Sequence, residues 1–369
     1  MMLKNKFSIN APFTAFKYVA INPNINISSD FVNRFQEASI NEENEVELNT
    51  IDRFKNRTTS NLALSISTKV YGILPFKVGN FQAIRHVMTP RIGFSYSPNY
   101  LKNDNYFQEF NDEYYDYFSG TLIGSTPRTS SKKINLSLGN VFQAKRSINN
   151  EEEKIDLFSL RMNTGYDVNK EEFKLSTLNS SLRSSLKNGT NIDMNFTHDF
   201  YEFNKEESVR INELRSVPRL TGIRLSTNFT LKGNKNDVQN DNELSEETKN
   251  FLNDFSSNVW QSRIGVSYTL NKINPDNKIE NFWLNSNTSI NVTNNWKLNY
   301  NARFNLIDNN IVRHNLTLYR EIDCWELFVD WTPNGYARGL YFRLNLKSDM
   351  LQDLKVEQKT GIYTTRPSF

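Results

Sequence analysis

Apolar and polar residues alternate with a period of two along most of the chain. The clearest example is residues 297–306, KLNYNARFNL, where every even position is apolar or aromatic and every odd position is polar or charged. A helix would mix the two kinds of side chain on each face, whereas a β-strand separates them. The same alternation returns in residues 264–270 and 341–347. The pattern predicts an all-β protein.

The alternation predicts roughly fifteen antiparallel strands, most of them longer than the five or six residues typical of soluble sheets. The expected strands span residues 13–28, 59–74, 83–98, 115–124, 131–145, 155–168, 173–187, 190–202, 219–232, 257–271, 281–293, 295–307, 311–321, 324–332 and 338–348. Segments rich in Asn and Gly suit hairpin turns at 293–295, 308–310 and 333–335. Long, charged connections are expected at 29–57, 99–114, 203–218 and 233–256, and the last could contain a short helix over 243–255.

Two architectures fit many alternating antiparallel strands: a soluble sandwich and a membrane β-barrel. Strand length favours the barrel, because about ten residues tilted near 45° cross the hydrocarbon layer. The tryptophans also favour it, because an interfacial girdle places aromatic rings near strand ends. All five lie near expected strand ends: Trp260, Trp283, Trp296, Trp325 and Trp331. We therefore expect residues 1–348 to form a partial transmembrane β-barrel, followed by a tail over 349–369.

Composition excludes several classes of protein. The 369 residues include 44 Lys and Arg against 41 Asp and Glu, so the net charge of +3 gives no reason to expect nucleic-acid binding. No apolar run approaches the ~20 residues of a membrane helix. The chain has 26 Phe and 16 Tyr, too many aromatic residues for a disordered protein. One cysteine and three scattered histidines show no metal spacing, and no catalytic constellation or cofactor motif appears. We expect neither an enzyme nor a cofactor.

Two stretches resemble the LPS-assembly protein LptD family, in its C-terminal, barrel-forming part. The first is VYGILPF at 70–76, followed by AIRHVMTPRIGFSY at 83–96. The second is REIDCWEL at 320–327, which continues through GLYF at 339–342 to KSDMLQDL at 347–354. The blocks at 84–90 and 324–325 are the more specific ones, and the regions between match mainly by pattern.

The resemblance implies an outer-membrane barrel in a Gram-negative bacterium that receives lipopolysaccharide and delivers it to the outer leaflet. A lipoprotein plugs the lumen of such a barrel, and a periplasmic bridge protein supplies lipid through an N-terminal domain. This chain shows neither a signal peptide nor that domain, and roughly fifteen strands are too few to close the family's barrel. We therefore expect a C-terminal fragment, embedded among outer-membrane lipids.

The resemblance also suggests roles for particular residues. Cys324 matches a family position that is linked by disulfide to the N-terminal domain, and the alternative is a free thiol. If the polar faces line a lumen, Lys297, Arg303, Arg343 and Lys347 are candidates to contact lipopolysaccharide phosphates. Generic lumen polarity would explain the same four residues.

Two other functions stay open: a porin or uptake barrel of another family, and a soluble all-β protein that binds at a surface. If Cys324 faces the periplasm, strand counting places the 233–256 connection there too, although long barrel loops normally face outward.

Overall fold

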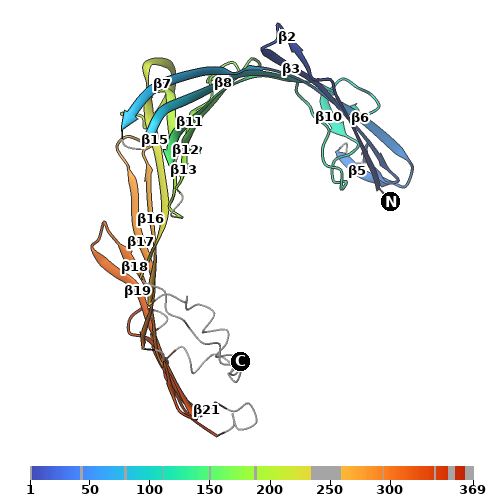
Figure 1. The fold of residues 1–369 in the computed structure, drawn as a ribbon. Coiled ribbons are helices and arrows are strands. Elements are labelled where there is room, and N and C mark those ends of the chain that lie inside the picture. The colour runs from blue at the N-terminus through green and yellow to red at the C-terminus, as the bar shows by residue number, and fades with distance from the viewer. Residues whose placement is uncertain are drawn as a thin grey trace. The chain divides into compact units, whose positions relative to one another are not determined.

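A computed structural model of the chain confirms an all-β, antiparallel protein (Figure 1). It describes residues 2–41, 45–78, 81–110, 112–148, 151–186, 189–233, 259–293, 295–335, 338–347 and 354–361. These residues form twenty-two strands, more than the fifteen expected. The short helix expected over 243–255 lies outside the described residues.

The part of the chain that the structure describes contains no helix long and apolar enough to cross a membrane.

The chain divides into two compact units. The first comprises Met1–Ser180 and Thr197–Arg219, and the second comprises Ser181–Phe196 and Leu220–Phe369. The first unit contains β1 (Met2–Asn10), β2 (Phe13–Ala15), β3 (Val19–Val32), β4 (Phe35–Ile40), β5 (Val46–Ile51), β6 (Lys55–Thr68), β7 (Val70–Val78), β8 (Phe81–Ser97), β9 (Phe107–Phe110), β10 (Glu113–Asp116), β11 (Ser131–Ile148) and β12 (Glu151–Asp167). The second contains β16 (Trp260–Asn271), β17 (Ile279–Thr293), β18 (Trp296–Asn305), β19 (Asn310–Ile322), β20 (Trp325–Thr332), β21 (Gly339–Leu346) and β22 (Lys355–Lys359). The residues of β13 (Leu178–Ser185), β14 (Asn191–Asn204) and β15 (Val209–Lys232) divide between the units.

In the first unit the main antiparallel sheet runs in the order β1, β3, β6, β8, β11, β12. Two prolines occupy positions inside these strands, Pro23 in β3 and Pro90 in β8. Each lies where a neighbouring strand is interrupted: Pro23 beside the break between β1 and β2, and Pro90 beside the break between β6 and β7. Proline has no N–H to donate, so the ladder is interrupted where it sits.

Two expected strands are wrong in this unit. The segment 13–28 is not one strand, because Phe16 and Lys17 have positive φ and form a hairpin turn between β2 and β3. The segment 115–124 forms only the end of β10, followed by turns. Its apolar residues serve a different purpose: Phe118 and Ile123 are buried in a small core with Val32 and Phe35. Alternating apolar residues there reflect packing in a loop rather than a strand.

The two long connections at 33–54 and 98–130 fold together into one lobe, which contains the hairpins β4–β5 and β9–β10 (Figure 1). Where β8 stops, tyrosine hydroxyls from this lobe accept hydrogen bonds from backbone N–H groups on the edge of β6. The N–H of Ser60 donates to the Tyr100 hydroxyl at 2.7 Å, and the N–H of Thr58 donates to the Tyr106 hydroxyl at 2.9 Å. Side chains thus replace the strand that would otherwise complete the ladder.

A buried ion pair fixes the lobe to the polar side of β3 and β6. Arg57 Nη2 lies 2.9 Å from Asp30 Oδ2, and both side chains are almost fully buried. Arg57 Nη1 also donates to the carbonyl of Gly124 and to the Thr126 hydroxyl. Asp116 accepts bonds from the N–H and the hydroxyl of Thr126. Burying a charge is costly unless it is paired and hydrogen-bonded, as it is here.

In the second unit β15 to β22 pair antiparallel, each with the next along the chain. The strand β22 falls within the tail expected over 349–369. Four strands, β16 to β19, separate the end of β15 from the turn at Cys324, so Lys232, Trp260 and that turn lie at the same end of this unit's strands. The loop expected over 203–218 is wrong: β14 and β15 extend through most of it and leave only a turn at 205–208.

Candidate functional site: the polar face of the second unit

The register of β15 to β22 separates two faces. On one face lie Leu298 of β18, its partners Ile290 and Leu318, and Val329 beyond them. On the other lie polar side chains such as Asn301, whose partners on the adjacent strands are Asn287 and Asn315. We call these the apolar face and the polar face. The separation follows directly from the period of two in the sequence.

The apolar face carries most of the tryptophans at strand ends. Trp260, Trp296 and Trp325 are the first residues of β16, β18 and β20, and these three strands begin at the same end of the unit. Trp331 is the penultimate residue of β20. Trp283 departs from the prediction, because it lies inside β17, where Arg303 stacks on its ring at 4.4 Å. Its partner Asn305 places it on the polar face.

The four predicted lumenal residues separate into two groups. Lys297, Arg303 and Arg343 occupy polar-face positions in β18 and β21, and Lys347 directly follows β21. Arg303 is exposed and lines a groove, whereas Arg343 and Lys347 pair with carboxylates and Lys297 is half-buried beside the Tyr319 ring. The structure therefore does not bring the four together as one site.

The groove that contains Arg303 has a volume of about 700 Å³ and crosses the polar face of β15 to β19. We call it the arginine groove. Its polar lining consists of arginine and asparagine with one serine and one threonine: Arg263, Arg303, Arg313, Asn228, Asn285, Asn287, Asn301, Asn315, Ser286 and Thr230. Each amide offers both donors and an acceptor, and each guanidinium offers five donors.

The arginines of this groove carry unneutralised charge. Arg303 and Arg313 are register partners on β18 and β19, and so lie directly opposite each other. Within the described part of the chain, neither they nor Arg263 form an ion pair with a carboxylate. Like charges directly opposite in a sheet are destabilising. An anion bound between them would relieve the repulsion.

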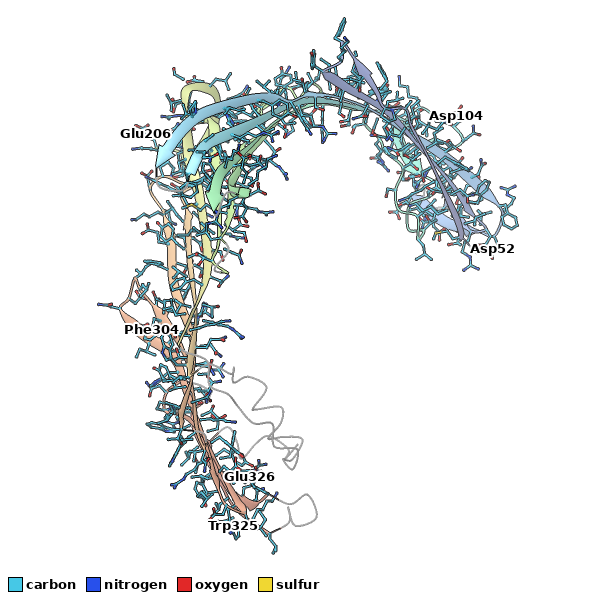
Figure 2. The ribbon with its side chains drawn as sticks, in the orientation of Figure 1. Asp52, Asp104, Glu206, Phe304, Trp325 and Glu326 are labelled. Atoms are coloured by element: carbon cyan, nitrogen blue, oxygen red, sulfur yellow. The ribbon has the colours of Figure 1, made fainter. Side chains whose placement is uncertain are left out.

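A second cluster on the same face has the opposite character. We call it the paired-charge cluster; it consists of Tyr319, Glu321, Glu326, Arg343, Asn345 and Lys347. Glu326, next to Trp325 in β20 (Figure 2), is only 1% exposed. Its Oε1 accepts from Asn345 Nδ2 at 2.8 Å and lies 3.9 Å from Arg343 Nη2. Lys347 pairs with Glu321.

The paired-charge cluster explains why three predicted residues are poor candidates for a ligand. Arg343 and Lys347 each have a carboxylate partner, and Arg343 also stacks on Phe328 at 5.8 Å. Lys297 lies over the Tyr319 ring at 5.9 Å. A ligand would have to displace the carboxylates from Arg343 and Lys347, and it would reach the half-buried Lys297 less easily than the exposed Arg303, whose partner is the Trp283 ring rather than a carboxylate.

Sequence reasoning missed Arg263 and Arg313, which complete the groove with Arg303. Both lie in correctly expected strands, so the alternation could have assigned them to the polar face. It could not show that they neighbour Arg303, because register depends on turn lengths and bulges. One such bulge falls between Arg303 and Phe304 and sets the Arg303–Arg313 pairing.

Cys324 lies in the two-residue turn between β19 and β20, and its side chain is exposed. The preceding residue, Asp323, has a positive φ that closes the turn. Because the chain has one cysteine, any disulfide must join another polypeptide segment. Among the described residues, no three His, Cys, Asp or Glu side chains gather as a metal site.

Comparison with models of known protein families identifies the family of the chain. None of the curated proteins compared with the chain matches it. A family model described as LptD protein matches residues 1–201, more than half of the 369 residues. The matched region includes the block at 83–96 that carries the resemblance in the sequence. The chain belongs to the LptD family.

Proposed function

We propose that the chain is part of an outer-membrane β-barrel that delivers lipopolysaccharide to the outer leaflet during membrane assembly. Family membership supports a role in lipopolysaccharide transport and outer-membrane assembly, at the outer membrane. The observation that carries the finer proposal is the unneutralised arginine groove on a continuous polar face. The role is transport and assembly rather than catalysis.

The chemistry of the groove suits the sugar–phosphate part of lipopolysaccharide. Guanidinium groups bind phosphate oxygens through two parallel hydrogen bonds, and Arg303 and Arg313 lie opposite each other where one phosphate would reach both. The surrounding amides of Asn285, Asn287 and Asn301 supply donors and acceptors for sugar hydroxyls. Lys297, Arg343 and Lys347 contribute to the polarity of the face rather than to direct contact in this proposal.

The apolar face suits contact with lipid. The exposed tryptophans Trp260 and Trp325 begin their strands at one end of the unit, where indole rings would sit at the headgroup level. Trp331 lies near the opposite end of β20. Aromatic residues at both boundaries of an apolar band are typical of outer-membrane barrels.

Under this proposal, Cys324 is one half of a disulfide to an N-terminal domain that receives lipid from a periplasmic bridge protein. Its exposure in a tight turn makes it accessible to such a partner, and an oxidising compartment would permit the bond. A lipoprotein inside the lumen completes the assembly.

Depletion tests the function directly. When the full-length protein is depleted in cells, we expect lipopolysaccharide to be lost from the outer leaflet and to accumulate inside, measured by surface labelling. Porin abundance measured in the same cells controls for a general failure of barrel assembly. Unchanged surface lipopolysaccharide would contradict the proposal and favour an uptake barrel.

Replacement of the cysteine tests the disulfide. The substitution Cys324→Ser should abolish a reductant-sensitive change in the protein's mobility on a non-reducing gel, since the bond has no alternative sulfur in this chain. The control is Ser267→Ala, which alters a polar-face hydroxyl in β16 and should leave the mobility shift intact. Identical migration of the wild type with and without reductant would show that Cys324 is a free thiol.

A further inference from the structure

In the first unit, β6 and β7 act as one continuous strand against β8. The register is unbroken across them, since Ser67 pairs with Arg91 and Val70 pairs with Met88. The strand β3, which covers the other side of β6, begins only at Val19, opposite Thr68. Among the described residues of this unit, β7 therefore pairs with β8 alone and presents an open edge.

The backbone groups on this open edge can be identified. The N–H groups of Thr58 and Ser60 point toward the segment that follows β8, because they donate to hydroxyls of that segment. Along a strand successive residues direct their N–H and C=O groups to opposite sides, so even-numbered residues face β8. Tyr71, Ile73 and Pro75 therefore face the open edge. A proline at this edge fits, because it has no N–H to leave unpaired.

The side chains on this edge are exposed and apolar. Ile73 is 71% exposed, and Leu74 and Tyr71 are also more than half exposed. An exposed, apolar edge strand is a template for pairing with another chain. Proteins normally protect such edges, so an exposed one of this length indicates a partner.

The charge around the edge has one sign. Residues 69–91, which contain β7 and the part of β8 that pairs with it, include four Lys and Arg and no Asp or Glu. Lys69 is exposed at the start of the open edge, and Arg85 of β8 stacks on the Tyr71 ring at 5.1 Å. Neither forms an ion pair within the described residues. A second copy of this basic edge would be repelled, whereas an acidic segment would be attracted.

We propose that the open edge of β7 binds an extended acidic segment of a partner polypeptide, which adds to the sheet as a further strand. The N–H groups of Tyr71 and Ile73 would supply backbone hydrogen bonds, and alternating apolar side chains would pack on the face that carries Val70 and Leu74, opposite the face of Lys69 and Arg85. Acidic side chains of the partner would pair with Lys69 and Arg85. This interaction is independent of the lipopolysaccharide contact proposed for the second unit.

Two fluorescent peptides of ten residues test the proposal, one alternating Val and Glu and the other alternating Val and Lys. Each is titrated against the full chain folded in detergent micelles, with binding read by fluorescence anisotropy and folding by heat-modifiable migration. We expect the Val–Glu peptide to bind at least tenfold more tightly than the Val–Lys peptide. Equal binding of the two peptides would overturn the proposal.

Variants locate the binding. Ile73→Pro removes one edge N–H without removing a bond to β8, and it should weaken Val–Glu binding about tenfold, whereas Ile73→Val should not. Reversal of the two charges by Lys69→Glu and Arg85→Glu should transfer the preference to the Val–Lys peptide, which keeps the test valid if Ile73→Pro misfolds. The proposal is refuted if Arg303→Gln/Arg313→Gln loses binding of the Val–Glu peptide while Ile73→Pro keeps it. That result would place the peptide in the arginine groove rather than at the edge of β7.

Discussion

The arginine groove and the paired-charge cluster lie on the same polar face of one unit, but only the cluster pairs its charged side chains with groups of opposite charge. In the cluster, Glu326 is buried and receives a hydrogen bond from Asn345, with Arg343 nearby. In the groove, Arg303 and Arg313 are exposed, opposed and without carboxylate partners. Charges that neutralise one another hold the structure together, whereas charges left unneutralised are available for a ligand.

In the first unit, by contrast, the lobe covers a charged pair on the polar side of the sheet. There the ion pair of Asp30 and Arg57 is buried beneath the lobe, and Arg57 also donates to the Gly124 carbonyl and the Thr126 hydroxyl of that lobe. The arginine groove has no such cover within the second unit's described residues. Arginine therefore serves as a structural residue in one place and as a candidate ligand-binding residue in the other.

Removal of the buried carboxylate should give the largest effect on stability. Glu326→Ala removes the buried carboxylate that lies beside Arg343 and accepts hydrogen bonds from Tyr319 and Asn345, so we expect the free energy of unfolding to fall by about 3–5 kcal/mol. Urea unfolding of the chain in micelles measures this loss. Glu326→Gln, which keeps an acceptor for Asn345, should cost less. A change below about 1 kcal/mol for Glu326→Ala would show that the cluster does not stabilise the sheet.

Removal of the groove charges should instead reduce ligand binding. The double variant Arg303→Gln/Arg313→Gln loses charge-assisted hydrogen bonds worth about 1.5–3 kcal/mol each, so lipopolysaccharide binding should weaken at least tenfold. Retention on immobilised lipopolysaccharide measures this effect. The matched control Arg303→Lys/Arg313→Lys keeps the charge but not the bidentate geometry, and should lose less.

Dephosphorylated lipopolysaccharide separates phosphate recognition from sugar recognition. We expect the wild type to bind it as weakly as the glutamine double variant binds the intact lipid, because both lack the same ion pairs. If the wild type binds both lipids equally, then the groove does not recognise phosphate.

The smallest effect should be a slight gain in stability. Arg313→Gln removes the repulsion with Arg303, so without ligand the free energy of unfolding should rise by a few tenths of a kcal/mol, on the order of other cross-strand pairs. Added salt screens exposed charges, and so should stabilise the wild type more than the variant. Urea unfolding at low and high salt measures both. A destabilised Arg313→Gln would mean that Arg313 has a structural partner.

The period of two predicted β16 to β21 of the second unit well, because each of these strands is paired on both sides and divides apolar from polar residues. It failed where local turns or loop packing decide the structure. Phe16 and Lys17 lie inside an expected strand but turn the chain through positive φ. Phe118 is apolar because it fills the core of the lobe, not because it lies in a strand.

For a related reason, the sequence could predict the face on which Arg303 lies but not the residues that neighbour it. Alternation shows which face Arg303 occupies, since a side chain's face depends only on its position in its own strand. Whether that arginine meets Arg313 or a carboxylate depends on the register with the next strand, which the bulge at Arg303 shifts. Sequence alone therefore grouped Arg303 with Lys347, whose partner Glu321 the pattern could not reveal.

Photo-crosslinking in cells tests the central claim most directly. A benzophenone amino acid is placed at Asn301 in the arginine groove, at Asn345 in the paired-charge cluster and at Leu298 on the apolar face of the full-length protein. The account predicts a lipopolysaccharide adduct from Asn301, and none from Asn345. Adducts from Leu298 alone, or equal adducts from Asn301 and Asn345, would contradict the claim that unneutralised arginines mark the path of the lipid.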